Sequence, residues 1–440
     1  MKRIIEHSLL SWKDSPRRKP LIVRGARQVG KTYSIEEFGR NNFDSYVKVD
    51  LERNRDWHRV FQGDLEARRI LAELEVLLNR TVSPGASLLF LDEIQSCPDA
   101  IMALRYFYEE LPDLHVVAAG SLIEFVLKEI SFPVGRVQFL EMHPMTFAEF
   151  LWAVGEGKAA DVVLGEPGPV PESVHHHILE ELKKYFFIGG MPEAVRVHQE
   201  RGSIHEALNV HGELCETYRH DFPKYAGRAD PNCLDAVLLG VARNLGKRIK
   251  YSRLSDEFAH TTVKRAFHML SKARVIRPVP SANPRGLPLG AMASVKRFKA
   301  IMVDIGLWHY LSGMRADRDY GMTDLLEIYR GVMAEHFVGQ EITASKNSDL
   351  YYWSREAKSS SAEVDYLFEV GGKIWAVEVK SGPAGRLRSL HKLLQTYPNC
   401  AGGLVFSSAP YAELPERKLT FLPLYFAYSA TGSGASGPLV

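Results

Sequence analysis

The sequence predicts an α/β protein built on a P-loop parallel sheet that carries helices on both faces. A helical lid, a winged helix and a further small α/β domain are expected to follow it. Three observations lead to this prediction. A glycine-rich loop ending in Lys31-Thr32 follows an apolar run near the N-terminus. Apolar strand-like runs then alternate with helical periodicity, which is typical of a parallel sheet. Further along, acidic and apolar residues alternate beside the glycine pair Gly371-Gly372.

Composition indicates the broad class of protein before any motif is considered. The chain has 440 residues, of which 45% are hydrophobic and 25% are charged. That is the balance of a globular protein of about two to four domains. The formal net charge of +2 gives no overall argument for nucleic acid, although local patches can bind it. No stretch approaches the roughly 20 apolar residues that span a bilayer, and the N-terminus lacks the apolar core of a secretion signal. We therefore expect a cytoplasmic protein that has no membrane partner.

The cysteines argue against two kinds of stabilised scaffold. They lie far apart and form no C-x-x-C pair: Cys97, Cys215, Cys233 and Cys400. A disulfide framework or a zinc site would need closer or paired spacing. We interpret them as reduced thiols.

The motif at residues 25–32 has the spacing of a phosphate-binding loop, G-x-x-x-x-G-K-T. Glycines let the backbone turn its N–H groups onto phosphate oxygens, and the following helix N-terminus adds positive potential. Lys31 is expected to reach the β- and γ-phosphates, and Thr32 to place its hydroxyl on Mg²⁺. The predicted cofactors are therefore ATP and Mg²⁺. The predicted nucleotide-binding residues are Gly25, Ala26, Arg27, Gln28, Val29, Gly30, Lys31, Thr32 and Tyr33.

A second motif follows about 60 residues later, where Leu88-Leu89-Phe90-Leu91 runs into Asp92-Glu93. Four consecutive apolar residues are typical of a central parallel strand that is buried on both faces. Two carboxylates at the end of such a strand form the Walker B pattern. Asp92 would hold Mg²⁺ through water, next to Thr32, and Glu93 would orient and polarise the attacking water.

The next strand-like run, Leu114–Gly120, ends at Ser121. In P-loop ATPases of this layout, the polar residue after that strand lies between the acidic pair and the γ-phosphate. Ser121 is therefore our candidate sensor. Arg136 is a candidate for phosphate contact, either within the subunit or from a neighbour in an oligomer. Arg105 is a weaker candidate, and a plain surface arginine is the alternative for Arg136.

Several motifs together resemble one family, the prokaryotic AAA-type ATPases that carry a C-terminal domain of unknown function. The matching segments are Arg24–Thr32, Leu91–Gln95, Ala119–Ser121, Gly135-Arg136 with Leu140, Pro144, Phe147, Glu149 and Phe150, and Gly189–Ala194. The resemblance covers most of the chain. One departure is Ala26, where many members are expected to have proline, and this change affects loop stiffness more than phosphate contact.

The resemblance and the shifts in composition predict five segments. These are an AAA-type P-loop ATPase domain at 1–153, a helical lid or linker at 154–230, a winged-helix-like domain at 231–312, a nuclease-like domain at 313–428 and a disordered tail at 429–440.

The middle of the chain predicts a loop followed by helices. Residues 154–174 are rich in glycine and proline, which favours a flexible loop. The adjacent His175, His176 and His177 would point in three directions on a helix, so they cannot share one metal ion. We expect them to be exposed at a helix start. Helices over Leu179–Phe187 and Ile204–Tyr218 would form the lid.

Residues 235–304 have the pattern of a winged helix. We expect helices over Leu234–Leu245, Leu254–Ala259 and Thr261–Leu270, the last in the recognition position. Strands at Val275–Val279 and Phe298–Val303 would flank the wing. The positive charges of this segment favour contact with the phosphates of duplex DNA. The alternative is a winged helix that serves only for packing between domains. The positively charged residues are Lys247, Arg248, Lys250, Arg253, Lys264, Arg265, Lys272 and Arg274.

The C-terminal part carries a second chemical pattern. Glu378 and Lys380 are two apart on one predicted strand, so both side chains point to one face, and Asp365 precedes them on the paired strand. Asp followed by E-x-K across a hairpin resembles the PD-(D/E)xK nuclease fold. There, Asp365 and Glu378 would bind Mg²⁺ and Lys380 would stabilise charge beside the phosphate. Glu335 would complete the metal site from a helix, and ordinary hairpin charges are the alternative.

Three functions are consistent with this sequence. The first is a Mg²⁺-dependent ATPase whose nucleotide cycle controls a DNA-contacting C-terminal half. The second is a nuclease gated by ATP. The third is a nucleotide switch that binds a partner protein through a nuclease fold that does not cleave.

Overall fold

The computed structural model describes residues 1–127, 132–226, 230–313, 320, 325–346, 349–357, 360–380 and 387–431. The chain forms two compact units. The N-terminal unit comprises Lys2–His143 with Lys272–Arg274, and the C-terminal unit comprises Pro144–Ser271 and Val275–Val440. Among the described residues, no helix combines the length and the apolarity that a membrane span requires.

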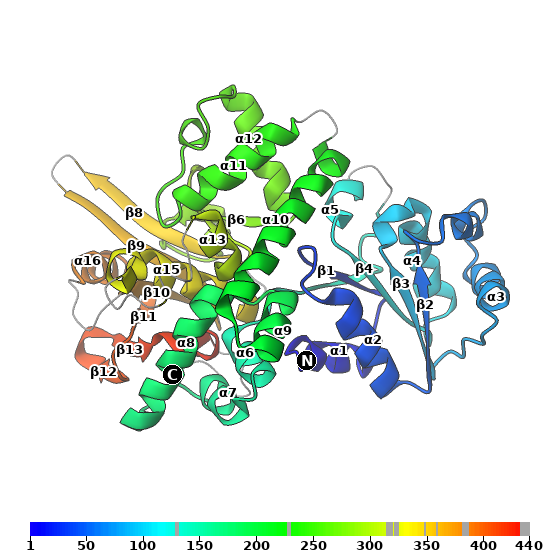
Figure 1. The fold of residues 1–440 in the computed structure, drawn as a ribbon, viewed down its shortest axis with the longest axis horizontal. Coiled ribbons are helices and arrows are strands. Elements are labelled where there is room, and N and C mark those ends of the chain that lie inside the picture. Colours follow the sequence, from blue (N-terminus) through cyan, green and yellow to red (C-terminus); the bar gives the residue numbers. More distant parts are fainter. Residues whose placement is uncertain are drawn as a thin grey trace. The chain divides into compact units, whose positions relative to one another are not determined.

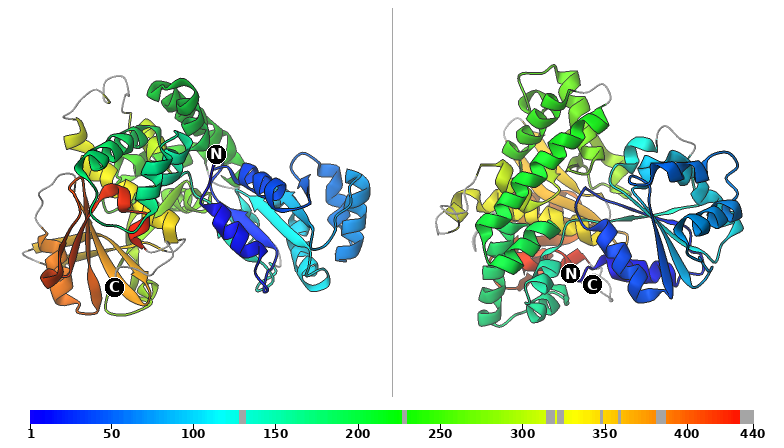
Figure 2. Two further views of the ribbon diagram at one scale, coloured as in Figure 1. Left: turned by 90° about the horizontal axis from the view of Figure 1, so that it is seen from below. Right: turned by 45° about the vertical axis from the view of Figure 1, so that its right-hand side comes forward.

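The N-terminal unit is built around a five-stranded parallel sheet with the order β2-β3-β4-β1-β5 (Figure 1). Helices lie on both sides of this sheet (Figure 2), so the predicted α/β fold is confirmed. The elements are α1 Ile5–Lys13, β1 Leu21–Arg24, α2 Lys31–Asn42, β2 Ser45–Asp50, α3 Ala67–Leu78, β3 Ser87–Asp92, α4 Pro98–Glu110, β4 His115–Gly120, α5 Ile123–Val126 and β5 Gln138–Glu141.

The apolar runs of the sequence form the centre of this sheet. Every residue of β3 and β4 is buried, as expected for strands that helices cover on both faces. β4 pairs with β1 on one side and with β3 on the other. Because parallel strands end at the same edge, the segments that follow β1, β4 and β3 meet there. The phosphate-binding loop and Ser121 lie in these segments, and the acidic pair Asp92-Glu93 spans the end of β3.

The C-terminal unit begins with helices α6 to α10. They are α6 Phe147–Ala153, α7 Gly157–Leu164, α8 Glu172–Ile188, α9 Pro192–Arg201 and α10 Ile204–Ala226. The predicted loop at 154–174 is therefore wrong in its first part, which α7 occupies, and at its end, where α8 begins. Ala159, Ala160 and Val163 are buried and form one apolar stripe of α7. The glycines and prolines between α7 and α8 misled the prediction for the whole stretch.

The segment expected to form a winged helix has two of the three predicted helices. α11 spans Pro231–Arg243 and α12 spans His260–Lys272. The predicted helix at Leu254–Ala259 is wrong, because only a 3-10 turn at Tyr251–Arg253 is present. The Leu254 carbonyl approaches Gly240 of α11 so closely that a β-carbon there would lie 2.1 Å from it. This packing, with the Ser255 hydroxyl accepting a hydrogen bond from the Glu257 N–H at 3.3 Å, favours a turn over a helix.

The strands expected to flank the wing are β6 Ile276–Ala282 and β7 Ala293–Met302, which pair antiparallel. They also join a larger mixed sheet of eight strands through β6, which pairs with β8. The sheet order is β12-β13-β11-β10-β9-β8-β6-β7. Its further elements are α13 Ile305–Leu311, α15 Leu325–Lys346, β8 Tyr351–Ala357, β9 Ser360–Val370, β10 Lys373–Val379, α16 Arg388–Thr396, β11 Cys400–Ser407, β12 Ala412–Leu414 and β13 Leu419–Pro423.

The predicted tail begins too early. Ser429–Thr431 form a 3-10 turn, and the buried Thr431 hydroxyl bonds to Ser345 Oγ at 2.7 Å. The rest of the predicted tail, residues 432–440, lies outside the described residues.

The Gly189-Gly190 turn joins α8 to α9 and is held by a buried carboxylate. Asp304 accepts hydrogen bonds from the Gly190 N–H at 2.6 Å and from the Leu307 N–H at 2.9 Å. Gly189 has φ of 71°, and a β-carbon on Gly190 would lie 2.0 Å from the Met145 carbonyl. The two glycines of the Gly189–Ala194 motif, which contributes to the family resemblance, therefore have a packing role.

A second buried carboxylate, Glu341 on α15, accepts a hydrogen bond from the Phe147 N–H at 3.1 Å. Burial raises the pKa of Glu341 from 4.5 to about 8. The folded state therefore holds its proton more tightly than the unfolded state does. The resulting stabilisation is complete below pH 4.5 and is lost as the pH rises through about 8.

We predict that Glu341→Gln raises the free energy of unfolding by about 2 kcal/mol at pH 8 and changes it little at pH 5. Glutamine keeps the oxygen acceptor and removes the charge. Urea unfolding followed by circular dichroism at both pH values measures the effect, with the exposed Glu200→Gln as control. An equal effect of Glu341→Gln at the two pH values would contradict the prediction.

Candidate functional site

The loop between β1 and α2 has a backbone that only certain residues adopt easily. Gly30 has φ of 93° and Gln28 has φ of 63°, in the left-handed region that favours glycine. A β-carbon on Gly25 would lie 2.2 Å from the Met142 carbonyl at the end of β5. The first and last glycines of the predicted motif are therefore both required by geometry.

Lys31 begins α2, and its side chain crosses the loop. Its Nζ donates to the carbonyls of Gly25 at 3.1 Å and Ala26 at 2.7 Å. Burial lowers the pKa of Lys31 to about 8, although the carboxylates of Glu93 and Asp92 oppose this shift. A phosphate placed in the loop would favour the charged form of this ammonium group and raise its pKa.

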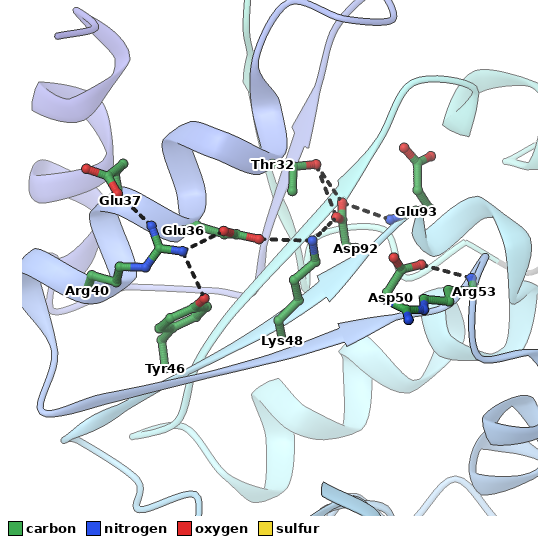
Figure 3. Close-up of polar contacts among 10 residues, drawn as sticks. All are labelled: Thr32, Glu36, Glu37, Arg40, Tyr46, Lys48, Asp50, Arg53, Asp92 and Glu93. Atoms are coloured by element: carbon green, nitrogen blue, oxygen red, sulfur yellow. Dashed lines mark hydrogen bonds and ion pairs between the residues drawn. The ribbon is translucent and has the colours of Figure 1, made fainter. Parts of the chain in front are cut away.

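Thr32 and Asp92 lie together in the structure. The Thr32 hydroxyl lies 3.2 and 3.1 Å from the two carboxylate oxygens of Asp92. Asp92 is buried at the end of β3, and it also accepts a hydrogen bond from the Glu93 N–H at 3.1 Å. Figure 3 shows the Asp92 carboxylate between these groups.

Lys48 on β2 is a member of this site that the sequence prediction missed. Its Nζ lies 3.0 Å from Asp92 Oδ2 and 3.0 Å from Glu36 Oε1 (Figure 3). Burial acts to lower the pKa of Lys48, but hydrogen bonds to Asp92 and Glu36 outweigh it and raise the pKa. The only hint in the sequence was that Lys48 occupies a polar position in the alternating apolar and polar pattern of Ser45–Asp50.

Glu93 lies in a left-handed conformation with φ of 49°, which turns the chain sharply after β3. Its carboxylate accepts a hydrogen bond from the Gln95 side-chain amide. Gln95 is a second residue to which the prediction gave no role. A β-carbon on Gly120 would lie 2.2 Å from Gln95 Oε1, so the glycine that ends β4 makes room for this amide.

Ser121 follows β4 directly and is buried. Its hydroxyl has no hydrogen-bond partner among the described residues. A buried hydroxyl without a partner is costly unless a ligand completes it, which is consistent with the predicted sensor role.

The two arginine candidates share one partner. Arg136 Nε lies 3.2 Å and Arg105 Nε lies 3.0 Å from Glu109 Oε1 on α4. Both side chains are about half exposed. Within the described part of the chain, their ion pairs lead to Glu109 and not to a loop residue. The predicted phosphate contact of Arg136 would require release from this pair.

The residues around the loop fit a magnesium nucleotide. The donors for phosphate are the loop N–H groups and Lys31, and the oxygens for Mg²⁺ are those of Thr32 and Asp92. The Ser121 hydroxyl, which has no protein partner among the described residues, supports the fit. Mg²⁺ bound there would neutralise charge that develops on the phosphates.

The C-terminal unit brings together the four residues of the second predicted site. Asp365 on β9 accepts a hydrogen bond from the Val379 N–H at 2.8 Å. Lys380 Nζ lies 2.5 Å from Glu378 Oε1. The second oxygen of Glu378 is buried and has no hydrogen-bond partner among the described residues. Such an oxygen is suited to a divalent cation, as the prediction for this pair requires.

Lys299 and Glu363 were not predicted, yet they join these residues into one cluster. Lys299 Nζ lies 3.0 Å from Glu335 Oε1, 2.7 Å from Glu363 Oε1 and 3.8 Å from Asp365 Oδ1. We call these residues the carboxylate cluster: Lys299, Glu335, Glu363, Asp365, Glu378 and Lys380. Lys299 comes from β7, in the segment assigned to another predicted domain, so sequence spacing gave no signal for it.

Burial is the largest cause of the pKa shifts of three carboxyl groups in the carboxylate cluster. It raises the pKa of Glu335 to about 8 and that of Glu378 to about 7, with repulsion from Asp365 as the next cause. Burial also raises the pKa of Asp365. It opposes the charge of Lys299, but the carboxylates of Glu335, Asp365 and Glu363 outweigh it and raise the pKa of that lysine.

The three adjacent histidines on α8 do point in different directions, but they are not all exposed. His175 is buried, and its nitrogens bond to Tyr425 Oη at 2.9 Å and to the Ser408 carbonyl at 3.1 Å. His177 lies 3.0 Å from Glu156 and converges with Glu181. Because Lys184 already pairs with Glu181 at 2.5 Å, we assign no metal to this group.

The predicted basic surface is partly retained. Lys264 and Arg265 are exposed on α12, and Lys247, Lys250 and Arg253 are exposed between α11 and α12. Arg248 pairs with Glu363 at 3.2 Å. Within the N-terminal unit, Arg274 pairs with Glu124 at 2.9 Å and with Glu141 at 2.5 Å, which removes it from the set available to phosphate.

Comparison with protein families assigns part of the chain. A family model described as an AAA domain matches residues 17–151. Two models described as domains of unknown function, DUF8612 and DUF4143, match residues 179–318 and 330–425. No curated protein matches the chain. The N-terminal unit thus carries a P-loop domain of AAA type.

Three solved structures of low identity are among those that match the chain. A Walker-type ATPase of Pyrococcus abyssi has 15% identity and a TM-score of 0.45, with 71% of this chain and 95% of that chain covered. The ORC1 protein of Aeropyrum pernix in complex with DNA has 14% identity and a TM-score of 0.28, covering 70% and 90%. A RuvB variant of Thermotoga maritima has 13% identity and a TM-score of 0.30, covering 64% and 89%.

We predict that Thr32→Val weakens the affinity for ATP about tenfold when Mg²⁺ is present, because the hydroxyl ligand is lost. With EDTA in place of Mg²⁺, the affinity should change little. Fluorescent ATP titrations under both conditions measure the effect. Ser34→Ala is the matched control, since its buried hydroxyl on the same helix has no hydrogen-bond partner in the described structure. Equal losses with and without Mg²⁺ would contradict the assignment of Thr32 to the metal.

Proposed function

We propose that the chain is a Mg²⁺-dependent ATPase whose nucleotide cycle controls a DNA-contacting, nuclease-like C-terminal half. The observation that carries the ATPase part is the contact between the Thr32 hydroxyl and the Asp92 carboxylate at 3.1 Å. A hydroxyl at a helix N-terminus and a carboxylate at a strand end are the pair of oxygens that hold Mg²⁺ in P-loop phosphoryl transfer, and this supports the proposal.

Each residue of this site then has a distinct role in hydrolysis. Lys31 and the loop N–H groups bind the phosphates and stabilise charge on them. Glu93 orients a water molecule and accepts its proton as the water attacks. Gln95 holds the Glu93 carboxylate in place, and Ser121 donates its hydroxyl toward the phosphate. Arg136 is the candidate for stabilising charge on the γ-phosphate.

The two central variants have different expected outcomes. Lys31→Ala should lose at least about thirtyfold in ATP affinity, because a buried charge partner of the phosphates is removed. Glu93→Gln should bind ATP within about threefold of wild type and hydrolyse it at least about a hundredfold more slowly. Binding by calorimetry and phosphate release measure these effects. Hydrolysis by Glu93→Gln at the wild-type rate would exclude Glu93 as the base.

The nuclease-like part rests on the carboxylate cluster. Asp365 and Glu378 offer oxygens to a divalent cation, which would activate water and stabilise charge on a phosphodiester. Lys380 contacts Glu378 and would lie beside the phosphate. The exposed cations of α12 and of the segment before it would contact the backbone of duplex DNA.

We predict that the protein cuts DNA with Mn²⁺ or Mg²⁺ and that Asp365→Ala abolishes cutting, because a metal oxygen is lost. The control is Glu369→Ala, an exposed acid on the same strand. Linear, branched, single-stranded and supercoiled substrates are tested on gels. No cutting of any of them would contradict the nuclease reading and favour a C-terminal half that only docks a partner protein.

For DNA contact, Lys264→Glu with Arg265→Glu should abolish a gel shift, because charge reversal repels phosphate. The control is the pair Lys158→Glu and Lys373→Glu, which reverses two exposed charges elsewhere in the C-terminal unit. Unchanged binding by the α12 variant would exclude this surface.

The ATPase rate with and without DNA separates DNA-linked hydrolysis from a switch that serves a partner protein.

A further inference from the structure

The most deeply buried charge of the carboxylate cluster is the ammonium group of Lys299. Its side chain is only 3% exposed. It contacts carboxylates from two different elements, Glu335 on α15 and Glu363 on β9, at 3.0 and 2.7 Å. An ammonium at such distances satisfies these oxygens in the same way that a bound cation would.

The contacts divide the oxygens of the cluster into two groups. Glu335 Oε1 and Glu363 Oε1 are committed to Lys299, and Glu363 is also paired with Arg248 at 3.2 Å. On the other side, Glu378 Oε2 is buried without a hydrogen-bond partner among the described residues. Asp365 adjoins both groups, with Oδ1 3.8 Å from Lys299 Nζ and Oδ2 accepting from the Val379 N–H. Glu335 Oε2 lies beside Gly246, where a β-carbon would be 3.2 Å from it. The metal position that these contacts favour is therefore between Asp365 and Glu378.

The balance of charges in the cluster also favours a single divalent cation. When all groups are ionised, Glu335, Glu363, Asp365 and Glu378 face Lys299, Lys380 and Arg248, and one negative charge remains in excess. One divalent cation overcompensates that excess. A second would be placed next to a buried ammonium group, where repulsion is strong because little water screens it.

We propose that Lys299 takes the place of a second cation, so that the cluster holds one divalent ion, between Asp365 and Glu378, while Glu335 positions Lys299 and does not bind the metal. This inference rests on the metal-dependent function proposed above and revises the role predicted for Glu335. Lys299 is thus a positioning residue with a permanent charge.

Counting bound Mn²⁺ tests this inference directly. The full-length, nucleotide-free protein carries Asp92→Asn in every sample, which removes the carboxylate of the P-loop site, and free Mn²⁺ is measured by electron paramagnetic resonance. The expected counts are one ion for the otherwise wild-type protein, two for Lys299→Met and one for Lys299→Met with Glu335→Gln. Lys296→Met, an exposed lysine on the same strand, should retain one.

The double variant also covers the case in which Lys299→Met does not fold, since it removes one positive and one negative charge together. Its Mn²⁺ affinity should stay within about threefold of wild type. A loss of tenfold or more would show that Glu335 is a metal ligand and would overturn the inference. A count of one for folded Lys299→Met would overturn it as well.

The outcomes separate this inference from the proposed nuclease function. If the Mn²⁺ counts are as expected but no DNA is cut, the nuclease function fails and the inference stands. If DNA is cut but the counts do not change with Lys299→Met, the inference alone fails. A wild-type count of zero contradicts both.

Discussion

The pairing of β4 between β1 and β3 is the constraint on which the chemistry of the N-terminal unit depends. Each of these strands is followed by a different functional group: the loop with Lys31, the buried Ser121 hydroxyl, and the pair Asp92-Glu93. Parallel strands end at one edge, so this order delivers all three groups to the same place. The helix dipole of α2 and the buried Lys31 then make that edge positive where phosphate would bind.

Much of this site could be predicted from sequence because its parts are local. The loop needs glycine where φ is positive and where Met142 approaches Gly25, and both demands appear as residue types at set spacing. The contact between Thr32 and Asp92 follows from two motifs in known order. Lys48 and Gln95 were harder to predict. The contact of Lys48 with Asp92 depends on the register between β2 and β3, and the position of Gln95 depends on the space that Gly120 leaves. A single sequence shows neither of these.

The C-terminal unit shows where local reasoning fails. The hairpin with Asp365, Glu378 and Lys380 was predicted from alternation, and Glu335 was predicted to lie on a helix. Lys299 was not, because it lies on a strand that the prediction placed in a separate wing. The pairing of β6 with β8 brings that strand into the larger sheet. The missing helix at Leu254–Ala259 has a similar cause, since tertiary packing against Gly240 overrides local propensity.

Both sites pair a lysine with carboxylates, yet the two lysines differ in what they can do. Lys48 is 27% exposed and holds Asp92 from the edge of the site, so its flexible side chain can turn toward water when a metal ion takes the carboxylate. Lys299 is 3% exposed and surrounded by its partners, and leaving them would bury unpaired charges at a cost of several kcal/mol. The first ammonium can exchange with a metal ion, whereas the second is part of the permanent structure of its site.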